Sequence, residues 1–169
     1  SAYAKDVMTY MPLSYMQDIE ALLEELHVTR FAAIGTSLGG IVSMLLASTW
    51  PKRVEGVVLN DVGPEIAPEG LARIQGYVGE GRSFDSWAHA ARAQEELNGE
   101  IYAAWQLADW IRFAKRTHKL NAKGRVVQDY DTRIAEPFEV PGSATGVDLW
   151  PALKAMVDIP VLIVRGENS

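Results

Sequence analysis

The chain of 169 residues contains no cysteine, which excludes disulfide bonds, a thiolate nucleophile and metal sites built from thiolates. No apolar run reaches the ~18 residues of a membrane-spanning helix, so the sequence predicts no membrane partner. Basic residues are also scarce, with 16 Lys and Arg against 22 Asp and Glu. A net charge of −6 disfavours binding to nucleic acid or to anionic membranes. The absence of cysteine and of a visible signal peptide favours a cytoplasmic location.

The composition is that of a globular protein, with 48% hydrophobic and 22% charged residues. The first third of the chain alternates between helical and strand-like patterns. Helices are predicted by apolar residues at helical spacing, with Ser14 and Gln17 in the form of a capping box, and strands by short apolar runs. The order is helix 14–26, buried strand 30–34, helix 38–49 and buried strand 54–59. This order predicts an α/β fold, with a parallel sheet and crossover helices.

The remaining chain divides into two parts. Residues 68 to about 118 are rich in Ala, Gln, Glu, Arg and Trp and show no strand-like run, and 65–148 are predicted to form a mostly helical insertion. The helical repeat is carried by Ile101, Trp105, Ala108 and Ile111. Residues 148–151 predict a new helix, with Asp148 or a neighbour as cap, and 160–166 predict a third buried strand. We therefore expect core segments at 1–64 and 149–169, separated by the insertion at 65–148.

One short motif carries candidate chemistry. Gly35-Thr36-Ser37-Leu38-Gly39 matches the G-x-S-x-G nucleophile elbow, and it follows a strand and opens a helix as that turn requires. The turn is expected to strain the backbone of Ser37 and to need small residues at Gly35, Gly39 and Gly40. The Leu38 backbone N–H would then face a developing oxyanion. The alternatives are a Gly-Ser turn without chemistry and, less favoured because the motif lacks a Walker lysine, a phosphate-binding loop.

The partners that activate such a serine are harder to find. None of His27, His89 and His118 is nominated as the base, because each precedes the serine or lies in the helical insertion. We expect His27 to be exposed near a helix end, and the other two to be structural or exposed. Asp61 follows the second strand and is a candidate acid, although a turn residue before Gly63-Pro64 is the simpler interpretation. Glu167 follows the third strand and is the other acidic residue at a strand end.

Four stretches together resemble the α/β-hydrolases that carry a helical cap. They are RFAAIGTSLGG at 30–40, VEGVVLNDVGP at 54–64, DLWPAL at 148–153 and PVLIVRGENS at 160–169. The resemblance implies that Ser37 is the nucleophile, that Leu38 supplies an oxyanion N–H, and that 65–148 form a cap over the site. Family members have earlier strands with an oxyanion loop, and a later acid and histidine. We therefore expect this chain to be an internal segment of a longer enzyme, a partial α/β-hydrolase.

The function that the resemblance implies is serine-dependent hydrolysis of an ester-like or related carbonyl substrate through an acyl-enzyme. A small-molecule substrate, no cofactor and no metal are expected, and the cap residues Trp105 and Trp110 are candidate contacts for an apolar substrate. Ser37 argues against dehalogenases and epoxide hydrolases of this fold, which use Asp. Carbon–carbon bond hydrolysis of ring-cleavage products, cofactor-free haloperoxidase activity and a non-catalytic ligand-binding role stay open, as does the oligomeric state.

Overall fold

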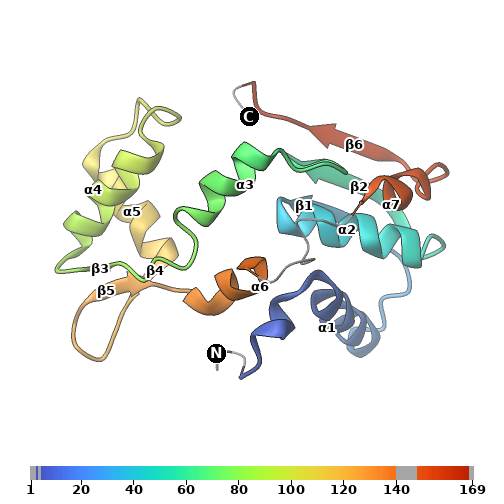
Figure 1. Ribbon diagram of the computed structural model, residues 1–169, viewed down its shortest axis with the longest axis horizontal. Coiled ribbons are helices and arrows are strands. Elements are labelled where there is room, and N and C mark those ends of the chain that lie inside the picture. The colour runs from blue at the N-terminus through green and yellow to red at the C-terminus, as the bar shows by residue number, and fades with distance from the viewer. Residues whose placement is uncertain (1–2, 4, 140–147, 168–169) are drawn as a thin grey trace. The chain divides into compact units, whose positions relative to one another are not determined.

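The computed structural model describes residue 3, residues 5–139 and residues 148–167 (Figure 1). The chain divides into two compact units. The first contains residues 1–77 and 133–169, and the second contains residues 78–132. Across the described ranges, none of the helices combines the length and the apolar character that crossing a bilayer requires.

A three-stranded parallel sheet organises the first unit. It consists of β1 (Phe31–Thr36), β2 (Val54–Asn60) and β6 (Val161–Val164), in the order β1-β2-β6. Both strand pairs are parallel, and they end together, with Thr36 opposite Asn60 and Asn60 opposite Val164. The carboxyl ends of all three strands therefore meet at one edge. The predicted α/β class, with its parallel sheet and crossover helices, is confirmed.

Helices of the first unit pack on this sheet and on one another. The main ones are α1 (Pro12–Glu25), α2 (Leu38–Thr49) and α7 (Trp150–Lys154), and α2 lies against both β1 and β2 (Figure 1). Shorter elements complete the unit: η1 (Val7–Tyr10), α3 (Pro68–Gln75), η2 (Thr132–Ala135) and α6 (Glu136–Glu139). The core joins Met44 of α2 to Leu59 of β2, and both are fully buried. Burying one such side chain stabilises the fold by about 1.5–3 kcal/mol.

One expectation about the helix ends is wrong in detail. α1 begins at Pro12, so the predicted capping box of Ser14 and Gln17 does not form, and the Ser14 hydroxyl donates to the Met8 carbonyl instead. Proline fits the first helical position because its fixed φ suits a helix and its missing N–H would have no acceptor there. The late helix was predicted to have Asp148 or a neighbour as cap, and its N-cap residue is the neighbour Leu149, while Asp148 Oδ1 accepts the Trp150 N–H at 3.0 Å.

The first and third strands were expected to be buried, and this is also wrong for the described residues. Ile34 of β1 is 79% exposed, and all four residues of β6 are exposed. β2 lies in the middle of the sheet, whereas β1 and β6 each pair with β2 alone among the described strands. An apolar strand is buried only where neighbours cover it, and the apolar run by itself does not reveal those neighbours.

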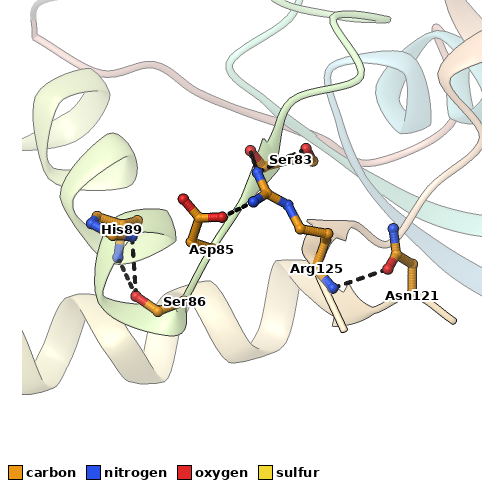
Figure 2. Close-up of polar contacts among 6 residues, drawn as sticks. All are labelled: Ser83, Asp85, Ser86, His89, Asn121 and Arg125. Carbon is orange, nitrogen blue, oxygen red and sulfur yellow. Dashed lines mark hydrogen bonds and ion pairs between the residues drawn. The ribbon is translucent and has the colours of Figure 1, made fainter. Parts of the chain in front are cut away.

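The second unit is a helical pair with a small antiparallel sheet. It contains α4 (Trp87–Asn98), α5 (Leu107–Thr117) and the strands β3 (Ser83–Phe84), β4 (His118–Leu120) and β5 (Val126–Gln128), in the order β3-β5-β4. Its core is formed by Ala90, Ala91, Trp110, Ala114 and Val126. Arg125 ties the hairpin to β3 by an ion pair with Asp85 and by donating to the Ser83 carbonyl at 3.1 Å (Figure 2).

The expectation of a strand-free segment over 68–118 is therefore wrong at β3, which is too short to show periodicity. The helical repeat expected from Ile101 to Ile111 is also interrupted. α4 ends at Asn98 and is followed by turns, and α5 begins only at Leu107. A capping box between Gln106 and Asp109 fixes this start. This unit lies within the predicted insertion at 65–148, whose role as a cap stays a prediction.

Candidate active site

Ser37 occupies the single-residue turn between β1 and α2. Its backbone has φ 51° and ψ −120°, and the residue is exposed. A positive φ is uncommon for a residue with a Cβ and costs about 1–3 kcal/mol, so the surrounding structure must impose it. The side chain makes no capping hydrogen bond to α2. The expected strain at this serine is therefore present, and its hydroxyl does not cap the helix that follows it.

The neighbouring glycines explain how the turn is closed. A Cβ on Gly35 would lie 2.2 Å from the carbonyl oxygen of Gly39 and 2.5 Å from the nitrogen of Gly40. A Cβ on Gly40 would lie 2.2 Å from Cγ1 of Val62. Gly35 and Gly40 thus let the strand and the helix approach closely. Gly39 was expected to be needed for the same reason, but this is wrong for the described structure, because a Cβ there meets nothing within 4 Å.

The N-terminus of α2 offers donors at this turn. The Ser37 carbonyl accepts the N–H groups of Gly40 at 2.9 Å and Ile41 at 3.2 Å, which starts the helix. Leu38 is the first residue of α2, and an N–H at that position has no acceptor within its own helix. The partial positive charge of a helix N-terminus favours an anion beside such a group. The position suits the predicted oxyanion role of Leu38, which stays a prediction.

The end of β2 supports the turn from the side. Ser37 donates its backbone N–H to the Asn60 carbonyl at 3.4 Å, and Asn60 Nδ2 donates to Thr36 Oγ1 at 3.1 Å. Asn60 was not identified from the sequence. Its position at the end of an apolar run, where turn residues begin, was the available signal.

Asp61 follows Asn60 and adopts a left-handed backbone with φ 56°. Its N–H donates to the Val164 carbonyl at 2.7 Å, and its Oδ1 accepts the Gly166 N–H at 3.3 Å. Both contacts reach the end of β6. The residue therefore forms a turn, as the simpler interpretation expected, and its side chain also bridges to the next strand. Its role as a catalytic acid stays a prediction.

The three histidines lie in different local settings. His27 follows α1 with φ 54° and is exposed, as expected. His118 is 5% exposed in the second unit, where its Nδ1 lies 3.2 Å from the Ala114 carbonyl and its ring packs edge-on against Phe84. Burial lowers the pKa of His118, and the Ala114 contact opposes this only in part. His118 Nε2 and Gln128 Oε1, on paired strands, are buried without a partner among the described atoms.

His89 belongs to a group of polar residues that superficially resembles a catalytic triad (Figure 2). Ser86 Oγ lies 3.3 Å from His89 Nδ1, but the same hydroxyl accepts the His89 backbone N–H and caps α4. The nearby Asp85 is engaged by Arg125. The arrangement is thus a helix cap beside an ion pair, which agrees with the structural or exposed role expected for His89.

An apolar hollow of about 440 Å³ lies beside the first turn of α2. Residues from α1, β1 and α2 line it: Tyr15, Ile19, Phe31, Ala33, Ile34, Leu38, Gly39, Val42, Ser43 and Leu46. Burial raises the pKa of Tyr15, with smaller contributions from Tyr10 and Asp18. Leu38 and Gly39 border this hollow, whereas Ser37 does not, so the exposed hydroxyl lies outside it.

The two tryptophans predicted to contact substrate belong to the second unit. Trp110 is 1% exposed, and its ring lies 4.8 Å from that of Trp105 and 6.1 Å from that of Tyr102. Trp105 is half-buried and stacks on Tyr102 at 4.2 Å. The burial of Trp110 favours a packing role, and substrate contact by either residue stays a prediction. In the part of the chain that the structure describes, no three His, Asp or Glu side chains form a group that could hold a metal ion.

Comparisons with known proteins agree with this geometry. The family model described as the alpha/beta hydrolase fold matches residues 9–168. The crystal structure of an alpha/beta hydrolase from Novosphingobium aromaticivorans DSM 12444 shares 55% identity and a TM-score of 0.88, and the match covers 99% of this chain and 59% of that chain. An esterase structure from Mycobacterium tuberculosis shares 25% identity and a TM-score of 0.66, and the match covers 98% of this chain and 55% of that chain.

The 3-hydroxybutyrate-oligomer hydrolase of Cupriavidus necator is 28% identical over 188 residues. That match covers 100% of this chain and 59% of the relative. The chain therefore spans less than two thirds of the length of each of these three proteins.

Proposed function

Because this chain belongs to the alpha/beta hydrolase fold family, we propose that it carries the nucleophile of a serine-dependent hydrolase. The substrate class is an ester or a related carbonyl compound of small size. The observation that carries the proposal is the backbone of Ser37, with φ 51° and ψ −120°, on an exposed turn at the N-terminus of α2. Backbone strain of this kind clusters at active sites and ligand-binding sites.

In the proposed reaction, a general base takes the proton of the Ser37 hydroxyl while Oγ attacks the substrate carbonyl carbon. The carbonyl π electrons move to oxygen, and the Leu38 N–H donates to the resulting oxyanion. Collapse of this intermediate expels the alcohol, which takes the proton from the base. Water then attacks the acyl-enzyme in the same manner, releases the acid and restores the Ser37 hydroxyl.

The base of this reaction is not proposed among the described histidines. His27 is exposed after α1, His89 belongs to the cap of α4, and His118 is buried in the second unit. Each is already accounted for by its local structure.

The names of two relatives support an ester as substrate. One is a 3-hydroxybutyrate-oligomer hydrolase and the other is an esterase. We also propose that the segment 65–148 caps the site of the whole protein, and the half-buried Trp105 is its candidate substrate contact. The absence of cysteine supports a cytoplasmic location.

Covalent labelling of the full-length protein with a fluorophosphonate probe tests the nucleophile. The wild type should be labelled and Ser37→Ala should not. Ser48→Ala is the matched control, because its hydroxyl lies in the same helix and donates to the Leu45 carbonyl. The control should be labelled at the wild-type rate.

Two outcomes would contradict the proposal. Undiminished labelling of Ser37→Ala would place the nucleophile elsewhere. A folded wild-type protein that takes no label would favour a non-catalytic, ligand-binding member of the fold. Cleavage of a diketone-like substrate with no turnover of p-nitrophenyl esters would instead move the protein to the carbon–carbon bond hydrolases, which use the same elbow.

A further inference from the structure

We infer that Asn60 and Asp61 form a positioning brace, which holds the nucleophile turn on one side and the end of β6 on the other. The inference deepens the proposed function, on which it rests. The two residues are consecutive at the carboxyl end of β2, the central strand of the described sheet (Figure 1).

The brace has one arm toward β1. The Asn60 carbonyl accepts the Ser37 N–H at 3.4 Å, and the Asn60 side chain donates to Thr36 Oγ1 at 3.1 Å. These two contacts grip the chain on both sides of the peptide that links Thr36 to Ser37. Because α2 holds the chain after Ser37 and these contacts hold the peptide before it, the positive φ of Ser37 can relax only if one of these contacts breaks.

The other arm reaches β6. The Asp61 N–H donates to the Val164 carbonyl at 2.7 Å, and Asp61 Oδ1 accepts the Gly166 N–H at 3.3 Å. The side chain therefore spans the end of β6 and the first residues after it. The left-handed backbone of Asp61, with φ 56°, turns the chain at this point. Asp and Asn tolerate this conformation better than other residues with a Cβ.

Together the arms fix the distance from the serine to the loop that follows β6. Groups at the carboxyl edge of a parallel sheet are where α/β proteins hold their ligands. A displacement of ~1 Å of a reacting group can lower a rate by ~10²-fold. In this account Asp61 acts through its acceptor oxygen and its backbone.

Three substitutions separate these contributions in the full-length protein. Asp61→Asn keeps an acceptor oxygen and tolerates the left-handed backbone, but removes the charge. Asp61→Gly still tolerates the left-handed backbone but removes the acceptor oxygen. Asp61→Ala removes the acceptor oxygen and also disfavours the left-handed backbone. Asp158→Ala is the matched control, because it removes an exposed carboxylate at the opposite end of β6.

The readout is the hydrolysis of a p-nitrophenyl ester, with kcat and KM measured across pH. Asp158→Ala should keep the wild-type kcat and pH profile, and Asp61→Asn should keep more of the wild-type kcat than Asp61→Gly or Asp61→Ala. Asp61→Gly and Asp61→Ala should lower kcat about tenfold with KM little changed. An Asp61→Asn enzyme as slow as Asp61→Ala would overturn the inference, since it would make the carboxylate charge, and hence a catalytic acid, the essential feature. Unchanged kcat in Asp61→Gly would overturn it as well.

Amide hydrogen exchange gives an answer that does not depend on catalysis. The Ser37 and Gly166 amides should exchange faster in Asp61→Gly than in the wild type, and Asp61→Asn should restore their protection. If Ser37 takes no fluorophosphonate label but this exchange pattern holds, the proposed function fails while the brace stands. If the label appears but protection is the same in all variants, the brace fails while the proposed function stands.

Discussion

Replacing Gly35 by Ala tests whether close backbone approach builds the nucleophile turn. The added Cβ would lie 2.2 Å from the Gly39 oxygen, 2.3 Å from the Gly39 carbon and 2.5 Å from the Gly40 nitrogen. Ordinary contacts begin at 3.4 Å, so the first of these pairs must separate by about 1.2 Å. All three atoms belong to the backbone, so rotation of a side chain cannot relieve these close contacts.

The magnitude follows from this geometry. Overpacking that forces side chains off their rotamers and shifts the backbone costs about 1–3 kcal/mol. A clash with backbone belongs at or above the upper end, so we expect Gly35→Ala to lower the free energy of unfolding by about 3 kcal/mol or more. At about 2–4 °C per kcal/mol for a chain of this size, Tm should fall by about 6–12 °C.

Thermal unfolding of three variants measures this effect. Gly40→Ala should be intermediate, because the atom at 2.2 Å is Cγ1 of Val62, a side chain that can turn aside. Gly39→Ala is the control, with no atom within 4 Å of its Cβ, and alanine in the first turn of α2 should stabilise by up to about 1 kcal/mol. Equal losses in Gly35→Ala and Gly39→Ala would refute the reasoning.

Three further predictions concern stability. Since burial lowers the pKa of His118 from 6.5, the unfolded chain binds its proton more tightly. The stability from neutral His118 should be full above pH 6.5 and lost as pH falls toward the lowered pKa of the folded state. His118→Gln should reduce this pH dependence of the urea midpoint, and an unchanged dependence would contradict the assignment. Trp110→Ala should lower the free energy of unfolding by about 3–5 kcal/mol in urea titrations, because the side chain is 1% exposed, and Trp105→Ala should lower it less. Equal losses would contradict this packing. Trp150 Nε1 donates to Glu65 Oε1 at 2.7 Å, so Trp150→Phe should lower the free energy of unfolding by about 0.5–1.5 kcal/mol, but much less in a Glu65→Ala background. Strictly additive losses would argue against this coupling.

The elements that the sequence predicts best are those with a strong local signal. The apolar runs before Gly35 and before Asp61 are strands of one parallel sheet, as their short length and the turn residues that bound them predicted. The strain at Ser37 was also predictable, since a strand and a helix joined by one residue leave the backbone little choice.

What the sequence did not predict depends on contacts between distant segments. Asn60 contacts the nucleophile turn because two parallel strands end together, and no short motif reports that register. The strand Ser83–Phe84 exists through its pairing with β5, since two residues cannot show a period. The exposure of Ile34 likewise depends on which strands adjoin β1 rather than on the strand's own composition.

A crystal structure of the full-length protein after reaction with a fluorophosphonate tests the central claim most directly. The decisive measurement is the distance from the phosphoryl oxygen of the adduct to the Leu38 nitrogen. We predict phosphorus bonded to Ser37 Oγ and an oxygen about 2.7–3.1 Å from that nitrogen. An adduct on a different residue, or a phosphoryl oxygen directed away from the N-terminus of α2, would contradict the account.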